Sequence, residues 1–548
     1  MGKTRIRGKR GPFVVAPASG VRIRTRLHVT AAEGLALRGI GSFLGGLYRT
    51  ELADRIGLGR LDRRAQAGWR ATAKRALTAV TSSRWSGAIT RAVEDQYQLG
   101  MRGLAQNVSS LDAAIATLEK RCALTPGERD EHGTKGYRDA AQRYAKTRRL
   151  AILKQRRAHA HTQLEEARPS VVVGGKRLWR SRNHLDQAEL TQSRWREVWD
   201  ASRMFLTADG ETGKRGGNET IRVDPETGTL RIKNPAALVD RFGSHLTITA
   251  SVVFSHRGSQ WRERIANNRA VRYDITDDPQ RGRWYLHASW TVPAPPVIPP
   301  AAVQQHRVLG VDVNDGHLAM CVVDPSGNAV GEPNTVEVAW QGLPASTRDG
   351  HLRAAITELL DRAQAAGSQA IVVEDLNFED ARATGRETQG RGKNGKRFRR
   401  SVAGIPTARF RNRLRGMASE RGISIIAVNP ANTSKAGKKY WREPLQEQTK
   451  TSGRDITGHH GASVTIARRG LGHKLSRHST GPRTAQRSIT SQPATLGENG
   501  NRVRAVRGTP HSSASPCGRP DRSSRKNRAP VPKTVRGTTE QCTVSLGF

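Results

Sequence analysis

The chain has 548 residues and carries Lys+Arg 92 against Asp+Glu 48, which gives a formal net charge of +44 at pH 7. A charge of this size predicts a polyanionic partner, and nucleic acid is the expected one because basic side chains release the counterions held by phosphates. The sequence has no apolar run of about twenty residues and no signal-peptide core, which argues against a membrane protein and leads us to expect a cytoplasmic, nucleoid-associated location.

The first half of the chain predicts a strand, then helices, then a β-rich region. In residues 1–29, apolar residues alternate with Arg22, Arg24 and Arg26, which indicates a strand with a basic outer face. Residues 30–168 show apolar spacing near 3.6 and are expected to form an inserted helical bundle. Residues 169–292 alternate with a period of two and are expected to form a barrel-like sheet that includes the first strand.

A proline-rich linker, residues 293–300, precedes a mixed α/β segment at 301–472. In this segment the pattern predicts strands at 308–313, 318–323 and 335–339, a helix at 349–366, a strand ending at Glu374, a helix at 406–421, a strand at 423–428 and a helix at 459–469. This is the order of an RNase H-like fold, in which the first and fourth strands are neighbours. The fold class is therefore multi-domain α+β, and the Ser, Thr, Pro and Arg-rich residues 473–548 are expected to be a disordered basic tail.

Two of the expected strands carry an acid where a buried strand normally has a hydrophobic residue. Asp312 lies within the run Val308–Val313, and Glu374 ends the run Ala370–Val373. Burying a carboxylate costs several kcal/mol unless a cation or strong donors compensate. Two acids from neighbouring strands therefore predict a site for Mg²⁺ or Mn²⁺, although either acid alone is more typical of a solvated strand end.

Four segments in this half, GVDVNDGHLA, IVVEDLNF, IPTARFRNRLRGMASERGISIIAVNPANTS and GHHGASVTIARRGLG, resemble the RuvC-type nuclease domain of TnpB. TnpB is a transposon-encoded protein of the OrfB type, related to type V CRISPR effectors. The motifs cover residues 308–472, while the preceding regions are similar to the family's wedge and recognition regions only in architecture. The resemblance implies an RNA-guided endonuclease that takes its guide RNA from a transposon end, cuts double-stranded DNA and uses two metal ions.

The resemblance assigns the metal-binding residues position by position. Asp312 matches the first catalytic acid and Glu374 the second. The position of the third acid falls on His459, while Asp455 lies one turn earlier and His460 follows directly, so each of these three is a candidate third ligand. The His pair is also typical of a plain helix start.

The chain departs from the family in its cysteines as well. The family often carries two CxxC pairs before the third acid, whereas residues 435–454 contain no cysteine. The four cysteines of the chain form no CxxC pair anywhere, so neither a disulfide framework nor a structural zinc site is expected.

The residues expected to contact nucleic acid fall into three groups. They are Arg22, Arg24 and Arg26 on the first strand; Arg386, Arg391, Lys393, Lys396, Arg397, Arg399 and Arg400 in the loop after Glu374; and Lys438, Lys439 and Trp441 after the last strand. The first group is a candidate guide-RNA contact, the second is expected to grip the strand to be cut, and the third to hold a strand by charge and stacking. A solvated basic loop is the alternative for the last two groups.

Two other functions remain open at this stage, and the sequence leaves the oligomeric state undecided. A nuclease-dead, guide-RNA-dependent DNA-binding repressor is favoured by the irregular third ligand. A strand-transferring DDE-type transposase would use the same metals, but its acids come in the order Asp, Asp, Glu, and the order here is Asp, Glu and then a later Asp or His.

Overall fold

The computed structural model describes residues 11–131, 133–293, 296–338, 343, 345–375 and 407–476. The elements up to residue 300 are β1 (Phe13–Val14), β2 (Gly20–Leu27), α1 (Ala31–Gly57), α2 (Arg63–Val80), α3 (Ser83–Ala123), α4 (Ala140–Glu165), α5 (Lys176–Ser181), α6 (Gln192–Ala201), β3 (Thr207–Ala208), β4 (Ile221–Val223), β5 (Leu230–Lys233), α7 (Val239–Phe242), β6 (His245–Ile248), α8 (Gly258–Ala266), β7 (Arg272–Asp278) and β8 (Arg283–Thr291). Short 3₁₀ helices lie at Asp186–Ala188, Arg215–Gly217, Ala236–Leu238 and Pro279–Arg281.

The helical insertion forms as its periodicity predicts. Helices α2, α3 and α4 begin directly after Asp62, Ser82 and Asp139, whose side chains accept a hydrogen bond from the third backbone N–H of each helix. None of the described helices is both long enough and apolar enough to cross a membrane.

The β-rich region differs from the expected barrel. Its described strands form two open sheets, one with the order β2-β8-β7-β3 and one with the order β4-β5-β6. The first strand does pair with β8, as expected, and the turn after Asp224 does join two strands, β4 and β5. Residues 176–201 contain the helices α5 and α6. Helix α6 forms because Thr191 caps a segment whose apolar residues recur with helical spacing.

The α/β segment contains α9 (Pro300–Val303), β9 (Val308–Val313), β10 (His317–Val323), β11 (Ala329–Glu337), α10 (Ala345–Ala365), β12 (Ala370–Glu374), α13 (Thr407–Glu420), β13 (Ser424–Val428), α14 (Thr433–Tyr440), α15 (Arg442–Gln448), a 3₁₀ helix at Lys450–Ser452 and α16 (Gly458–Gly470). Its six-stranded sheet has the order β1-β13-β12-β9-β10-β11, so the first and fourth strands of the segment are neighbours as predicted. Residues 435–454, for which a solvated basic loop was one of two alternatives, are largely helical.

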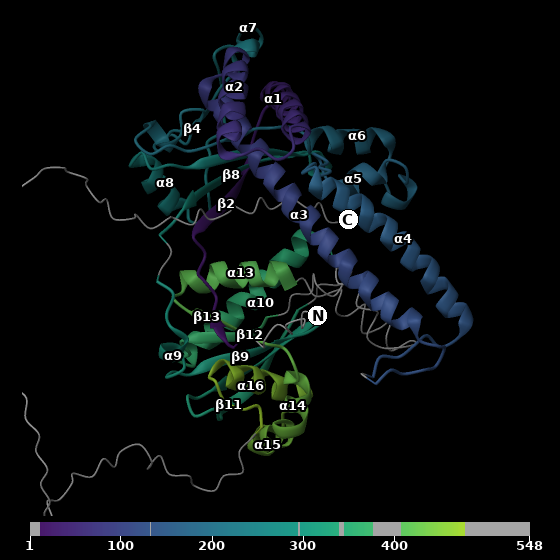
Figure 1. Cartoon of the computed structure of the whole chain (residues 1–548). Coiled ribbons are helices and arrows are strands. Elements are labelled where there is room, and N and C mark those ends of the chain that lie inside the picture. The colour runs from purple at the N-terminus through teal and green to yellow at the C-terminus, as the bar shows by residue number, and fades with distance from the viewer. Residues whose placement is uncertain are drawn as a thin grey trace, which may run out of the picture. The chain divides into compact units, whose positions relative to one another are not determined.

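Helices cover both faces of this sheet, with α10 and α13 on one side and α16 on the other (Figure 1), and each face carries its own hydrophobic core. Odd-numbered positions such as Leu309, Val311 and Val373 pack with α10 and α13. Even-numbered positions such as Val308 and Val372 pack with α15 and α16. Because side chains alternate along a strand, Asp312 and Glu374 belong to the α16 face.

Helix α16 lies very close to β9, and a glycine makes this approach feasible. A Cβ built on Gly310 would lie 2.1 Å from the backbone oxygen of Ser463 and 2.8 Å from Cβ of Ala467. The backbones of the strand and the helix are therefore in direct contact beside Asp312.

We expect Gly310→Ala to lower the free energy of unfolding by roughly 1–3 kcal/mol, because the methyl group forces α16 away from the sheet. Urea denaturation of the full chain measures this change. Gly350→Ala in α10 is the control, since a Cβ there meets nothing within 4 Å and alanine favours helix. Equal stability of the two variants would contradict the close packing.

Candidate active site

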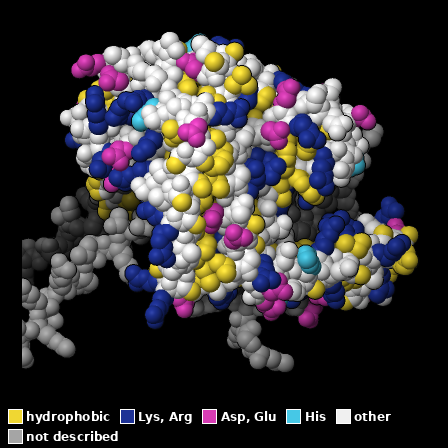
Figure 2. Space-filling model, turned by 90° about the horizontal axis from the view of Figure 1, so that it is seen from above, with side chains coloured by type: hydrophobic (Ala, Val, Ile, Leu, Met, Phe, Trp, Pro, Cys, Tyr) yellow, Lys and Arg dark blue, Asp and Glu magenta, His cyan; other side chains and the backbone are white. Residues whose placement is uncertain are grey.

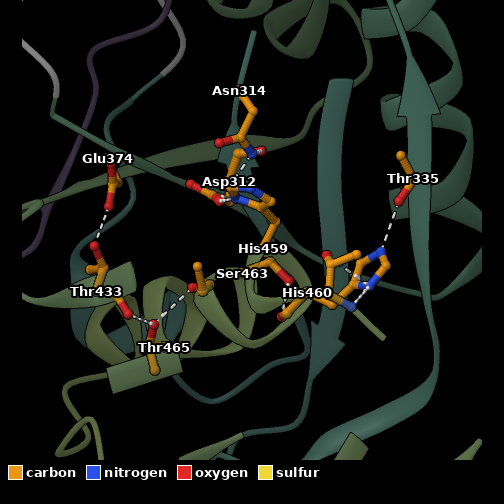
Figure 3. Close-up of polar contacts among 11 residues, drawn as sticks. Asp312, Asn314, Thr335, Glu374, Thr433, His459, His460, Ser463 and Thr465 are labelled. Carbon is orange, nitrogen blue, oxygen red and sulfur yellow. Dashed lines mark hydrogen bonds and ion pairs between the residues drawn. The ribbon is translucent and has the colours of Figure 1, made fainter. Parts of the chain in front are cut away.

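Two acids, the buried Asp312 and the half-buried Glu374, lie side by side at the carboxyl ends of β9 and β12. The strands run parallel with Val311 opposite Val373, so the next residue on each strand is the acid. The Asp312 side chain is only 7% exposed. Figure 3 shows Asp312 next to His459 of α16 and Glu374 above Thr433. The sequence prediction that folding brings Asp312 and Glu374 together is therefore matched by the coordinates.

Asp312 is held by two donors that meet on one oxygen. Its Oδ2 lies 2.9 Å from Nδ1 of His459 and accepts a hydrogen bond of 3.0 Å from Nδ2 of Asn314 (Figure 3). The hydrogen bond between Asp312 and His459, together with the negative charge of Asp312, raises the pKa of His459, while partial burial of the ring opposes the rise. His459 thus donates through Nδ1, and Nε2 is the ring nitrogen that remains to accept a proton.

The ring of His317 packs edge-on against His459. The ring centroids are 5.0 Å apart with an interplanar angle of 75°. Burial lowers the pKa of His317, and the neighbouring His459 charge lowers it further. The neutral His317 ring therefore restricts the rotation of His459 and favours the orientation that reaches Asp312.

Hydrogen bonds and nearby charges compensate the burial of Glu374 less fully than that of Asp312. Burial raises its pKa to about 7, the charge of Asp312 adds to the rise, and a hydrogen bond from Thr433 and the charge of Arg469 oppose it. The Thr433 hydroxyl contacts both Oε1 of Glu374 and the carbonyl oxygen of Pro430. A hydroxyl has one proton, so it donates to the ionised Glu374 and can turn to Pro430 when Glu374 is protonated.

The loop that carries Thr433 is fixed from α16. Arg469 donates to the carbonyl oxygens of Asn429 and, at 2.9 Å, of Ala431. Thr465 donates to the carbonyl oxygen of Thr433 at 2.9 Å. Helix α16 thus orients both acids, Asp312 through His459 and Glu374 through the Thr433 loop.

Two of the three candidate third ligands do not join this pair. Asp455 is exposed and precedes α16, because the helix begins only at Gly458. His460 is buried and faces away from the acids: its Nδ1 accepts from the backbone N–H of Thr457 and its Nε2 lies 2.8 Å from the Thr335 hydroxyl. His460 completes a capping box with Thr457, which explains its place at the helix start.

The basic candidates have different outcomes. Arg22, Arg24 and Arg26 lie on the exposed side of β2, as the alternation predicts, with Arg22 paired to Asp274 at 3.3 Å. The loop residues from Arg386 to Arg400 lie outside the described residues. Lys and Arg side chains are spread widely over the face seen in Figure 2.

The third basic group requires a correction. Lys438 and Lys439 are exposed on α14, but Trp441 is only 4% exposed and packs in the core beneath the sheet. Its Nε1 donates to the carbonyl oxygen of Leu475 at 3.0 Å, and the Arg468 guanidinium lies over its ring. A buried indole cannot stack on a base, so the stacking role predicted for Trp441 is wrong.

Sequence reasoning missed four residues that shape the site: Asn314, His317, Thr433 and Arg469. Asn314 directly follows the acid-bearing strand, and this position was its available signal. Thr433 follows the end of β13 on the same sheet edge as the acids, and this position was its available signal. Nothing in the spacing pointed to His317 or Arg469.

The donor set fits a divalent cation held by two carboxylates. Mg²⁺ takes one or two carboxylates and keeps several waters, and a cation would offset both the burial and the charge of Asp312 that raise the pKa of Glu374. In the part of the chain that the structure describes, no three His, Cys, Asp or Glu side chains are grouped to hold one ion. Among the described residues, the two acids thus have no third ligating side chain grouped with them.

The sequence matches no protein-family model and no curated protein. Among solved structures, the chain is similar to RuvC of Thermus thermophilus in complex with a Holliday junction substrate, with 18% identity over 30% of this chain and 91% of that chain, and a TM-score of 0.20. A second Thermus thermophilus RuvC structure matches with 19% identity over 30% of this chain and 92% of that chain, again with a TM-score of 0.20. At these values the function proposed below rests on the geometry of the site and not on this likeness.

The raised pKa of Glu374 predicts a pH-dependent stability. Its folded pKa of about 7 exceeds the ordinary value of 4.5, so the free energy of unfolding should fall as the pH rises from about 4.5 to about 7 and then stay level. The full effect is on the order of 3 kcal/mol. Glu374→Gln cannot ionise and should lose this fall, which makes it more stable than the wild type at pH 8 without divalent ions.

Urea denaturation at pH 5 and pH 8 in the presence of a chelator measures the effect. The exposed Glu337, substituted Glu337→Gln, is the matched control and should keep the wild-type pH dependence. An unchanged fall in Glu374→Gln would show that another group is responsible.

Proposed function

We propose that the chain is a divalent-cation-dependent DNA endonuclease, guided by RNA as the TnpB-like motifs imply. The observation that carries the nuclease proposal is the pair of acids, the buried Asp312 and the half-buried Glu374, at one end of adjacent parallel strands. The net charge of +44 supports a nucleic-acid substrate. The proposal includes a division of the chain into domains. Their limits are 1–29, 30–168, 169–292, 293–300, 301–472 and 473–548.

Each residue of the site has a distinct task in the proposed reaction. Asp312 and Glu374 would hold the cation, which when bound supplies a water of lowered pKa and charge neutralisation at the phosphate. His459 keeps Asp312 in one orientation and can accept a proton at Nε2. Thr433 and Arg469 keep Glu374 available in its ionised form.

A two-ion reaction requires a further ligand beyond this pair. Neither Asp455 nor His460 provides it, because the first is exposed and the second is used in the helix cap. The core of the proposal is therefore one cation held by Asp312 and Glu374. A second cation would take its further ligands from water, from the phosphate or from His459.

Asp312→Ala should abolish cleavage of target DNA while leaving RNA and DNA binding close to the wild-type level, because the acid lies at the end of a strand and not on the basic surface. Cleavage of a matched plasmid with Mg²⁺ and gel-shift titration measure the two properties. Glu337→Ala on β11 is the control and should cut normally. Lost binding with retained cutting in Asp312→Ala would refute the assignment.

Metal binding has a readout independent of cleavage. Mg²⁺ or Mn²⁺ should raise the melting temperature of the wild-type chain, since the ion binds only where folding pairs the acids. The increase should disappear in Asp312→Ala and persist in Glu337→Ala. An equal increase in all three proteins would place the ions elsewhere.

One observation favours a second function, the nuclease-dead DNA-binding repressor. His459 occupies the position of the third acid and is hydrogen-bonded to Asp312, so the site has fewer acids than the motif pattern calls for. Stable occupancy of a matched plasmid without nicks in the presence of Mg²⁺ would select the repressor. Sequencing of RNA that co-purifies with the chain tests the guide in either case, and a non-coding RNA ending in a variable segment would support it.

A further inference from the structure

A cluster of indole rings lies on α5 and α6, outside the acid site. The indole platform consists of Trp179 on α5 and Trp195 and Trp199 on α6. Trp195 and Trp199 are stacked with ring centroids 5.5 Å apart and an interplanar angle of 14°. Trp179 is 38% exposed, although an indole of this size is normally largely buried.

Specific contacts fix the indole platform. Nε1 of Trp195 donates to the carbonyl oxygen of Leu178 at 2.8 Å and so ties α6 to α5. Gly174, with a φ of +97°, lies against the edge of Trp199, where a Cβ would be 2.9 Å from the ring. Trp195 and Trp199 are therefore pre-positioned, and Trp179 directly follows Leu178, the residue to which Trp195 is hydrogen-bonded.

Arginines lie over two of the rings. The Arg182 guanidinium is 3.9 Å from the centre of the Trp179 ring, and the Arg203 guanidinium is 5.0 Å from the centre of Trp199. Guanidinium and indole planes of this kind are the surfaces on which unpaired bases stack.

The charge on the α5 side of the platform is of one sign, whereas α6 also carries Glu197, which is paired with Arg194, and Asp200. Residues 174–185 contain four cations, Lys176, Arg177, Arg180 and Arg182, and no Asp or Glu. Lys176 and Arg180 are exposed, and neither has an acidic partner among the described residues. An apolar protein partner would leave these charges unsatisfied, whereas phosphates would satisfy them.

We infer that the indole platform binds unpaired bases of an RNA, with Trp179 as a stacking surface and Lys176 and Arg180 as phosphate contacts. A duplex would not fit this surface, because its base faces are already stacked on each other. The choice of RNA over DNA rests on the proposed function, which places a guide RNA in the complex.

Fluorescence anisotropy with the full chain and a fluorescein-labelled 15-nucleotide oligouridine tests the inference. Trp179→Ala should bind roughly 5- to 150-fold more weakly, as expected for the loss of one stacked base. Trp179→Phe keeps a ring and should retain most of the affinity. Leu58→Ala, which removes another exposed apolar side chain, is the control and should bind as the wild type does.

The charged part has its own measurement. Arg180→Ala should reduce the dependence of the affinity on salt by about one phosphate contact. Arg64→Ala removes an exposed arginine of α2 and is the control. It should leave the salt dependence of the affinity unchanged, because the proposed phosphate contact is made by Arg180. Equal changes in both variants would indicate general attraction and overturn the assigned contact.

Three results would overturn the platform: wild-type affinity in Trp179→Ala, an equal loss in Leu58→Ala, or tighter binding of the same-length oligothymidine or of an RNA duplex. The first two leave the nuclease proposal intact, because DNA cleavage and its loss in Asp312→Ala are measured separately. Absence of RNA binding by the wild-type chain would overturn both the platform and the RNA guide, but not metal-dependent cleavage.

Discussion

The parallel pairing of β9 and β12 is the constraint on which the site depends. Parallel strands place their carboxyl ends at the same edge of a sheet, and the register that sets Val311 opposite Val373 brings the following acids together. Because side chains alternate, a shift by one residue would turn one acid toward the hydrophobic core beneath α10 and α13. The hydrophobic residues on both faces therefore determine the chemistry at the strand ends.

Helix α16 converts this edge into an organised site. Its backbone approaches β9 at Gly310, which places the first turn of the helix over Asp312. His459 then reaches Asp312, while Thr465 and Arg469 hold the loop of Thr433 against Glu374. One helix thus controls both carboxylates, and a displacement of α16 would be felt at each of them.

The two acids differ in how far the protein compensates their burial. Asp312 accepts two hydrogen bonds on one oxygen, whereas Glu374 relies on one hydroxyl and the more distant charge of Arg469. The energetic cost therefore concentrates on Glu374. A folded protein tolerates such a cost where a bound cation or substrate offsets it, which is typical of functional sites.

The sequence by itself determined the strands β9 to β13 and the helices α10, α13 and α16, the exposed face of β2 and the two acids, because each depends on a local period or on a charged residue in an apolar run; it did not predict α14, α15 or the pairing of β1 with β13. It also placed His459 at the third ligand position, but it offered Asp455 and His460 equally and treated Trp441 as a surface residue. Only the tertiary structure distinguished His459 from Asp455 and His460, because α16 begins at Gly458 and its capping box turns His460 toward Thr335. Contacts between segments far apart in the chain decide three further features, and local periodicity does not record such contacts. These features are the burial of Trp441, the roles of Thr433 and Arg469, and the open sheets in place of a barrel.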